Sequence, residues 1–374
     1  MRDAGFRTKD RFDWALFISA ALIAVVGIVN LYSATSVASA SRSELYLSQV
    51  YWFVAGGILA AIVASVDTRH IERIGYILYA IGVSLLVLVL ALGKDIRGSS
   101  RWIFGFQPSE VMKLGLIVAI AKYLHSDPKP EGRTLRDLIG PAAITFVPVL
   151  LVLKQPDLGT ALILSLIFIA AMGLTRIKWQ TVVTLAGALA VSLPLAWNYV
   201  LKDYQRKRIT TFLNPEEDIQ GAGWHSHHAR IAIGNGGLFG QGYMKGTQNQ
   251  YLFIPDQHTD FPFPVFAEDW GFAGSLVLIG LYAFLVLWAI RVASQARDRF
   301  SAVVAVGVGA LIFWHAFFNL GMVVGILPVV GVTLPLFSYG GSSVITILVG
   351  LGLLMNVSMR RYSYSAFQGK SARF

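Results

Sequence analysis

The chain has 374 residues, of which 55% are hydrophobic and only 14% are charged, and it carries a net charge of +10. About a quarter of the residues of a soluble domain are charged, so this composition excludes a water-soluble globular enzyme, and the continuous apolar blocks exclude the alternating strands of an outer-membrane barrel. Because cysteine is absent, disulfides, thiolate catalysis and cysteine-bound metals are excluded as well.

Ten apolar blocks follow one another along the chain, each close to the roughly 20 residues that a membrane-spanning helix needs. They cover residues 14–34, 50–66, 74–93, 108–123, 139–153, 159–175, 180–200, 268–291, 302–325 and 338–358. We therefore expect an all-α polytopic membrane protein with about ten transmembrane helices, forming a single integral-membrane domain over residues 1–374. The one long connection, residues 201–267, is polar, and loops of this length usually carry function.

Lysine and arginine residues are divided unevenly between the two sides of these spans. One side, which includes both chain ends, has 19 of them, and the opposite side has 11, six of them in the 201–267 loop. Cytoplasmic loops are enriched in Lys and Arg, so we expect both termini in the cytoplasm and the long loop outside. Because this bias accounts for the positive net charge, we expect no nucleic-acid partner.

Glu110 and Lys113 lie three residues apart near the start of the fourth block, where they share one helix face and can pair. Ionisable groups at membrane depth are costly unless they face a partner or a cavity. Pro108 suits the first helical position, and Glu110 suits the positive end of the helix dipole. Two interpretations stay open: a structural ion pair that ties helices together, or part of a functional polar cavity.

A similar sequence, Gln155-Pro156-Asp157, opens the sixth block and places another carboxylate at a helix start. By itself Asp157 indicates a well-capped helix. Together with Glu110 it indicates a shared polar cavity at the outer leaflet.

The end of the long loop reads His258-Thr259-Asp260-Phe261 and is followed by Glu268 and Asp269. A carboxylate beside a histidine, near the membrane surface and flanked by apolar residues, is a candidate general base. The alternative is that Asp260 caps a short helix and that the two later acids favour a helix N-terminus.

Basic residues of the outer connections suit anionic ligands. Arg101 lies in the second outer connection, and Arg206 and Arg208 open the long loop. Such residues commonly bind lipid headgroups, and around a cavity they also suit a pyrophosphate, whose oxygens Arg binds in bidentate fashion. The glycine-rich run from Ser338 to Ser343 is consistent with an anion-binding turn or with a plain tight turn.

Taken together, these motifs resemble one family, the SEDS (shape, elongation, division and sporulation) proteins of bacterial cell-wall synthesis. The resemblance covers nearly the whole chain. It rests on Arg101-Trp102-Ile103, Gln107-Pro108-Ser109-Glu110, Gln155-Pro156-Asp157-Leu158-Gly159-Thr160, Tyr204-Gln205-Arg206, His258-Thr259-Asp260-Phe261, Gly325-Ile326-Leu327-Pro328-Val329-Val330-Gly331 and Leu334-Pro335-Leu336-Phe337-Ser338-Tyr339-Gly340-Gly341-Ser342. Gly240-Gln241-Gly242, Gly246-Thr247-Gln248-Asn249-Gln250 and Leu327-Pro328-Val329-Val330-Gly331 look like the elongation members rather than the division members.

The resemblance implies ten helices with both ends inside, and a peptidoglycan glycosyltransferase in the bacterial cytoplasmic membrane with its active site facing out. It implies that lipid II is the substrate, that Asp260 is the catalytic general base, and that Glu110, Lys113 and Asp157 line the cavity. Arg101, Arg206, Arg208, His258 and Ser338 are the further candidates for substrate binding. It also implies a class B penicillin-binding protein and other proteins of the elongation complex as partners.

The leaving pyrophosphate needs its charge neutralised by Arg or Lys, or by a divalent cation such as Mg²⁺ or Mn²⁺ held by carboxylates. The sequence departs from the common family form at Pro262 and Pro264, and these prolines put helical geometry just after Asp260 in doubt, but not the identity of Asp260. A lipid II flippase or secondary transporter is the alternative from another class. Its charges would lie near the bilayer middle and its halves would repeat, whereas no repeat is visible and Asp157 and Asp260 lie at the outer edge. A structural scaffold is a third possibility, weakened by the costly membrane-depth charges.

Overall fold

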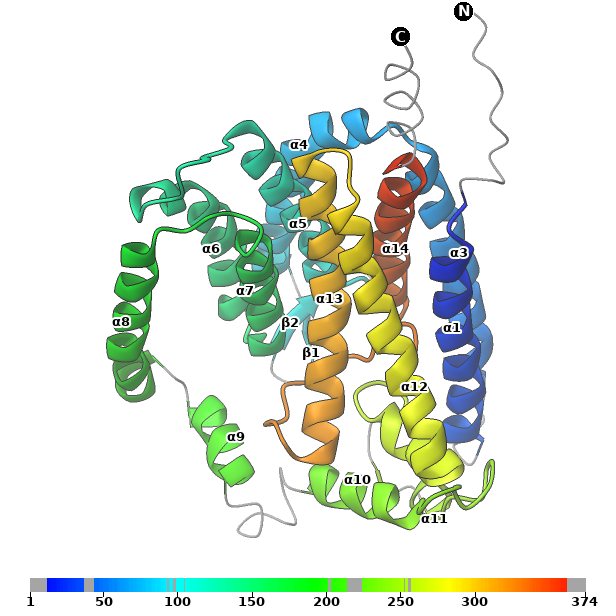
Figure 1. Cartoon of the computed structure of the whole chain (residues 1–374). Coiled ribbons are helices and arrows are strands. Elements are labelled where there is room, and N and C mark those ends of the chain that lie inside the picture. The colour runs from blue at the N-terminus through cyan, green and yellow to red at the C-terminus, as the bar shows by residue number, and fades with distance from the viewer. Residues whose placement is uncertain are drawn as a thin grey trace, which may run out of the picture.

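The computed structural model is built almost entirely from helices (Figure 1). It describes residues 12–36, 44–92, 94–96, 99–103, 105–200, 203–213, 224–251, 253–254 and 257–361. The elements are α1 (Trp14–Thr35), α3 (Leu45–Ser65), α4 (Thr68–Leu92), β1 (Lys94–Ile96), β2 (Ser99–Trp102), α5 (Pro108–Ser126), η2 (Arg136–Leu138), α6 (Ile139–Lys154), α7 (Leu158–Met172), α8 (Trp179–Leu195), η3 (Ala196–Val200), α9 (Asp203–Leu213), α10 (Trp224–Asn235), α11 (Thr247–Gln250), α12 (Pro262–Ser294), α13 (Arg299–Val324) and α14 (Gly341–Arg361).

Each of the ten predicted apolar blocks coincides with a helix, and the fold is that of a multi-pass, all-α membrane protein. Within the described residues, eight helices are long and apolar enough to cross a membrane. α7 is apolar but has only 15 residues, and α5, which contains Glu110 and Lys113, is not among the eight. The count of ten spans therefore stays a prediction.

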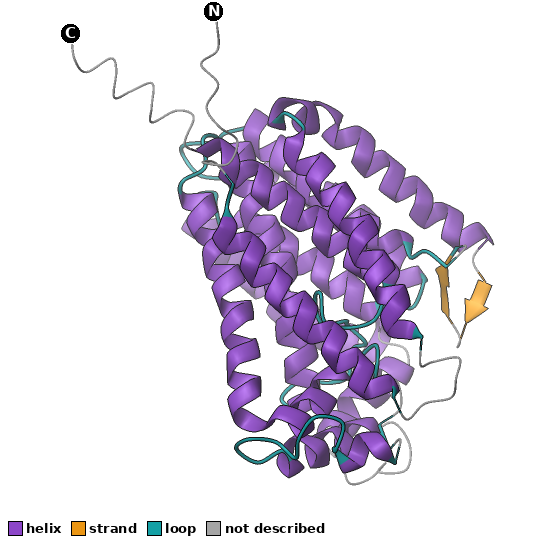
Figure 2. Ribbon diagram, turned by 90° about the vertical axis from the view of Figure 1, so that its right-hand side faces the viewer, coloured by secondary structure: helices purple, strands orange, loops and turns teal. Residues whose placement is uncertain are grey.

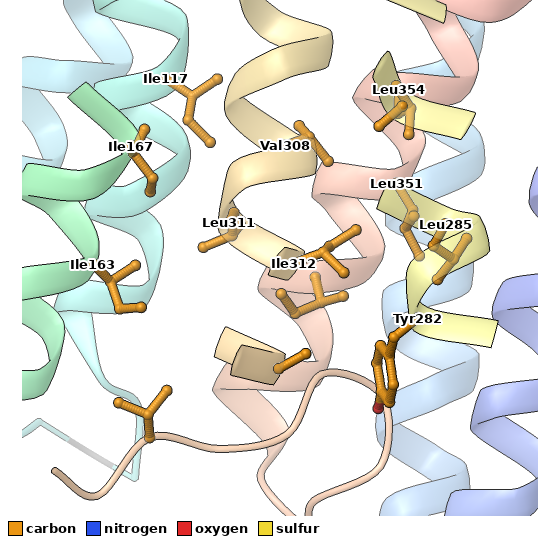
Figure 3. Close-up of a cluster of buried hydrophobic side chains, with 14 of the residues drawn as sticks. Ile117, Ile163, Ile167, Tyr282, Leu285, Val308, Leu311, Ile312, Leu351 and Leu354 are labelled. Atoms are coloured by element: carbon orange, nitrogen blue, oxygen red, sulfur yellow. The ribbon is translucent and has the colours of Figure 1, made fainter. Parts of the chain in front are cut away.

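The core of the molecule is centred on α13, which is surrounded by α5, α7, α12 and α14. Figure 3 shows Val308, Leu311 and Ile312 of α13 between Ile117 of α5, Ile163 of α7 and Leu351 of α14. These side chains are buried. Because α13 contacts these four helices, its polar residues lie where several elements meet.

The two described ends of the chain lie on the same side of the bundle. The Asp13 carboxylate, at the start of α1, accepts hydrogen bonds from Ser358 Oγ of α14 and from Trp288 Nε1 of α12, the latter at 2.9 Å. Figure 1 shows α9, α10 and α11 at the opposite end. The location of both described chain ends on one side agrees with an even number of membrane crossings. The basic residues before Phe12 and after Arg361, which were counted for the orientation, lie outside the described residues.

Beside the helices, the connection from α4 to α5 forms a small two-stranded antiparallel sheet, β1 and β2, that the sequence analysis did not predict (Figure 2). Lys94 pairs with Trp102, and Ile96 pairs with Ser99. Arg101 follows on β2, so the hairpin carries it back toward the bundle.

The 201–267 connection differs from the prediction in two ways. It contains the short helices α9, α10 and α11, and it ends at Phe261 because α12 begins at Pro262, six residues before the predicted start. The backbone is helical from Pro262 onward, which resolves the doubt about helical geometry after Asp260. A proline in the first helical turn loses no hydrogen bond, because the first N–H groups of a helix have no partner within it.

Between α13 and α14, residues 325–340 form an irregular segment, which we call the 325–340 segment and of which residues 334–338 are buried. Irregular backbone at membrane depth requires partners within the protein. Side chains from other helices supply them: Arg208 donates to the Val329 carbonyl, Asn319 to Val332, His315 to Thr333 and Tyr282 to Pro335. The segment is therefore fixed by hydrogen bonds from elements far apart in sequence.

Candidate active site

A cavity of about 460 Å³ lies where β2, α5, α7, α9, α13 and the 325–340 segment meet. Six of the residues singled out in the sequence line it: Arg101, Glu110, Lys113, Asp157, Arg208 and Asp260. They come from five separate parts of the chain. The fold thus brings together most of the predicted polar residues in one place.

Glu110 and Lys113 form the predicted ion pair in the first turns of α5. Lys113 Nζ lies 2.7 Å from Glu110 Oε1, and both side chains are buried. Pro108 occupies the start of the helix, and Glu110 is the acidic residue of its first turn. Each charge gives the other the partner that a buried charge needs, as in a structural ion pair. Both residues also line the cavity. The structural and the functional interpretations of the pair are therefore compatible.

His315 of α13 is a third member of this network and was not among the residues predicted from the sequence. Its Nε2 lies 3.0 Å from Lys113 Nζ, and its Nδ1 lies 3.2 Å from the Thr333 carbonyl oxygen. A carbonyl oxygen only accepts, so Nδ1 carries the proton, and Nε2 of the neutral ring accepts from Lys113. His315 stands inside the predicted ninth span, where an ionisable residue at membrane depth is itself a functional signal.

Asp157 caps α7 and faces the cavity at the same time. Its carboxylate accepts from the Thr160 N–H at 3.1 Å and from Thr160 Oγ1 at 2.9 Å. Gln107 Nε2 donates to the same carboxylate at 3.4 Å. Arg101 Nη1 lies 3.8 Å from Asp157 Oδ2, and the guanidinium also donates to the Gln155 and Pro156 carbonyls. The capping interpretation is confirmed, and it fixes Asp157 and Arg101 together at the wall of the cavity.

Asp260 lies in the turn directly before α12 and is partly exposed. Its backbone carbonyl accepts a hydrogen bond of 2.9 Å from Asn319 Nδ2, which also donates to Val332 at 2.7 Å. The carboxylate lies against Gly331, where a Cβ atom would be 3.4 Å from Asp260 Oδ2. The backbone of Asp260 is thus bound to α13, and its side chain reaches the 325–340 segment.

Three predicted residues are not among those that line the cavity. Arg206 donates to the Asn198 carbonyl at 2.9 Å. Ser338 Oγ accepts from the Leu334 N–H at 2.7 Å and so closes a turn. The carbonyl of His258 accepts from the Tyr339 N–H at 2.8 Å, so His258 lies next to a residue that does line the cavity.

The later acids of α12 have a different role. Glu268 accepts hydrogen bonds from the Gln248 N–H and Thr247 Oγ1, both at 3.1 Å, and Asp269 accepts from Ser33 Oγ at 2.5 Å. Both are buried, and neither is among the residues that line the cavity. They connect α12 to α11 and α1.

The charged residues of the cavity are balanced in sign. Arg101, Lys113 and Arg208 are basic, and Glu110, Asp157 and Asp260 are acidic. A partly exposed carboxylate can take a proton from an attacking hydroxyl, and nearby Arg and Lys side chains can stabilise an anionic leaving group. The arrangement is therefore suited to the transfer of a group from a phosphorylated donor to a hydroxyl acceptor.

Comparisons with known proteins identify the family of the chain as a whole. The model of the cell cycle protein family that is described as FtsW, RodA and SpoVE matches residues 13–363. The peptidoglycan glycosyltransferase MrdB of Escherichia coli K12 is 37% identical over 337 residues, which cover 88% of this chain and 90% of that protein.

Two solved structures are also similar. A chain from a peptidoglycan synthase complex that coordinates polymerization and crosslinking matches with a TM-score of 0.81 and 34% identity, covering 94% of this chain and 99% of that one. The Thermus thermophilus rod shape determining protein RodA matches with a TM-score of 0.70 and 32% identity, covering 94% and 98%.

Proposed function

Because the chain belongs to the SEDS family of FtsW, RodA and SpoVE cell cycle proteins, we propose that it is a peptidoglycan glycosyltransferase of the elongation type. The names of its relatives, peptidoglycan glycosyltransferase and rod shape determining protein, support the activity and the elongation role. The observation that carries the proposal is the cavity, in which Asp260 shares one space with basic residues of three different elements.

The proposed reaction joins two molecules of lipid II. The 4-hydroxyl of an acceptor GlcNAc attacks C1 of a MurNAc, the C1–oxygen bond to undecaprenyl pyrophosphate breaks, and that oxygen keeps the electron pair. Asp260 accepts the hydroxyl proton as the new glycosidic bond forms. Arg101 and Arg208 stabilise the growing negative charge of the pyrophosphate.

The site faces the outer side of the bacterial cytoplasmic membrane in this proposal. The 19 to 11 division of basic residues supports that orientation. The partner we propose is a class B penicillin-binding protein, which crosslinks the strands, together with other proteins of the elongation complex. Support comes from the similar chain in a complex that coordinates polymerization and crosslinking.

A divalent cation stays a proposal. Within the described residues no group of three His, Asp or Glu side chains is arranged to hold a metal, and no step above depends on one. Mg²⁺ usually binds one or two carboxylates and completes its shell with phosphate oxygens and water, so a cation would arrive with the substrate. Polymerisation should then stop in EDTA and return with Mg²⁺ or Mn²⁺, and full activity in EDTA would exclude the cation.

The test of the function is Asp260→Asn, which keeps the size of the side chain but cannot accept the proton. A positioned base contributes about 10²–10⁴-fold, so glycan polymerisation from purified lipid II should become difficult to detect, while lipid II binding persists. Glu131→Gln, an exposed carboxylate change outside the cavity, is the control and should polymerise normally.

Wild-type polymerisation by Asp260→Asn would exclude Asp260 as the base and make Asp157 or Glu110 the next candidate. Lipid II translocation without any polymerisation, even with the crosslinking partner present, would favour transport instead of transfer.

A further inference from the structure

The buried group formed by Glu110, Lys113 and His315, which we call the α5–α13 triad, has hydrogen-bonding capacity that the described residues do not use. An ammonium group has three N–H donors. Lys113 Nζ donates to Glu110 Oε1 at 2.7 Å and to His315 Nε2 at 3.0 Å. Its third donor is therefore available to an acceptor in the cavity that all three residues line.

Glu110 offers the complementary group. Its Oε1 bonds to Lys113, whereas its Oε2 is buried and has no hydrogen-bond partner among the described residues. Glu110 as a whole is only 5% exposed. A buried carboxylate oxygen without a partner is costly, so the triad requires a hydrogen-bond donor from whatever occupies the cavity.

The net charge of the triad favours a neutral hydroxyl group over a phosphate as the ligand. The ammonium and the carboxylate cancel, and His315 is neutral because Nε2 accepts from Lys113 while Nδ1 donates to the Thr333 carbonyl. A phosphate would bring negative charge and no donor toward the Glu110 oxygen, which is unfavourable. A sugar hydroxyl both donates and accepts, and it matches one N–H beside one carboxylate oxygen.

We propose that the α5–α13 triad binds a hydroxyl group of a substrate sugar, and that His315 is the positioning residue that aims the Lys113 ammonium at it. The pyrophosphate then lies against the arginines, Arg101 and Arg208. His315 Nε2 accepts from the ammonium, and the ring of His315 is itself bound to the 325–340 segment through the Thr333 carbonyl. This inference rests on the proposed function, since it assigns a part of the proposed lipid II substrate to these residues.

Two substitutions at His315 separate its two contacts. His315→Asn places an amide N–H where Nδ1 donates to Thr333, but it is too short to accept from Lys113. His315→Gln reaches the Nε2 position and can accept from Lys113, but it loses the Thr333 contact. Each leaves one buried partner unsatisfied, so we expect similar losses of thermal stability from the two variants.

Binding is measured with two probes in lipid nanodiscs, lipid II and undecaprenyl pyrophosphate, which has the same lipid and pyrophosphate but no sugar. All chains also carry Asp260→Asn, so that lipid II is not consumed. His315→Asn should weaken lipid II binding about tenfold or more, the size expected for a hydrogen bond to a charged group, and leave undecaprenyl pyrophosphate binding unchanged. His315→Gln should bind lipid II nearly as well as the parent chain.

Equal weakening for both probes would overturn the inference, because the triad would then contact the pyrophosphate or affect only folding. Unchanged lipid II binding in His315→Asn would overturn it as well. Polymerisation by the chain with Asp260 intact is measured separately. If that chain fails to polymerise while His315→Asn still weakens lipid II selectively, the proposed function fails and the sugar-binding inference stands.

Discussion

At the scale of single residues, the position of the Asp260 carboxylate depends on a neighbour without a side chain. Gly331 has a φ angle of +71°, a left-handed conformation that costs a residue with a Cβ about 1–2 kcal/mol. Its surface is also the part of the 325–340 segment that Asp260 Oδ2 lies against. An added Cβ would only make ordinary van der Waals contact with that oxygen, so glycine is required here for its backbone conformation.

Gly331→Ala should reduce stability by about 1–2 kcal/mol through backbone strain. Relief of that strain moves the part of the 325–340 segment that Asp260 Oδ2 contacts, so polymerisation should fall by about 10²-fold, because small displacements of a catalytic group are costly. Thermal unfolding and lipid II polymerisation measure the two effects. Gly57→Ala is the control, since nothing lies within 4 Å of its added Cβ. Normal polymerisation by Gly331→Ala would show that the position of the Asp260 side chain does not depend on the backbone conformation of Gly331.

The ion pair of α5 allows a second test at the same scale. Lys113→Met leaves the Glu110 carboxylate buried without its cation, and breaking a buried pair in this way costs about 3–5 kcal/mol. The double variant Glu110→Gln with Lys113→Met removes both charges and should recover most of that loss, without recovering polymerisation. Equal instability of the single and double variants would show that the charge of Glu110 is not what destabilises the protein.

At the scale of elements, α12 is interrupted so that another segment can pair with it. Gly271 has φ 68° and ψ −164° inside the helix. This break leaves carbonyl groups before it and N–H groups after it without hydrogen bonds within the helix. Residues 236–242 take them up: the Glu268 and Asp269 carbonyls accept from Gln241 and Gly242, and the Phe272 and Ala273 N–H groups donate to Gly237 and Leu238. The loop after α10 thereby replaces one turn of helix hydrogen bonds and holds α10 close to α12.

Gly271→Ala should prevent this pairing. The added Cβ would lie 2.3 Å from the Gly240 nitrogen, and the φ angle is unfavourable for alanine. We expect a loss of about 2–4 kcal/mol from overpacking and strain, measured as the unfolding midpoint in detergent. Gly280→Ala, in the same helix and with nothing within 4 Å of its Cβ, should be neutral or slightly stabilising. Similar behaviour of both variants would contradict the role given to the break.

At the scale of the whole molecule, the two ends of the bundle are built from different parts of the chain. One end holds the described termini, joined through Asp13 and Ser358. The other end holds the small helices of the long connection. Arg208 of α9, one of these helices, lines the cavity and donates a hydrogen bond to the Val329 carbonyl. The excess of Lys and Arg on the side of the termini predicts that this end faces the cytoplasm and that the end with α9, α10 and α11 faces the outside.

This orientation can be measured directly. A reporter that is active only in the cytoplasm, fused after Gln241, should give no signal, whereas the same reporter fused after Arg361 should be active. A signal from the Gln241 fusion would show that the long connection lies in the cytoplasm. The site would then have no access to lipid II on the outer surface, contrary to the proposal.

The sequence by itself determined the apolar blocks, their helical state and the residues that carry charge into them. These features depend on local composition: a stretch of about 20 apolar residues becomes a helix wherever it lies in the chain. The same reasoning identified Glu110, Lys113, Asp157 and Asp260, because charges at helix starts and membrane depth are visible in the sequence. The effect of Pro262 stayed open in the sequence, since a proline is compatible with a helix only in its first turn, and the sequence does not show where that turn begins.

Only the tertiary structure decided which of these residues meet. The cavity joins elements from Arg101 to Ser343, and no local pattern specifies which helix faces are opposed. His315 and Asn319 show this most clearly: one turn apart on α13, they reach Lys113 and Asp260 respectively and bind both sides of the site to the 325–340 segment. Their partners lie 202 and 59 residues away in sequence, so the packing of α13 at the centre of the bundle creates these contacts.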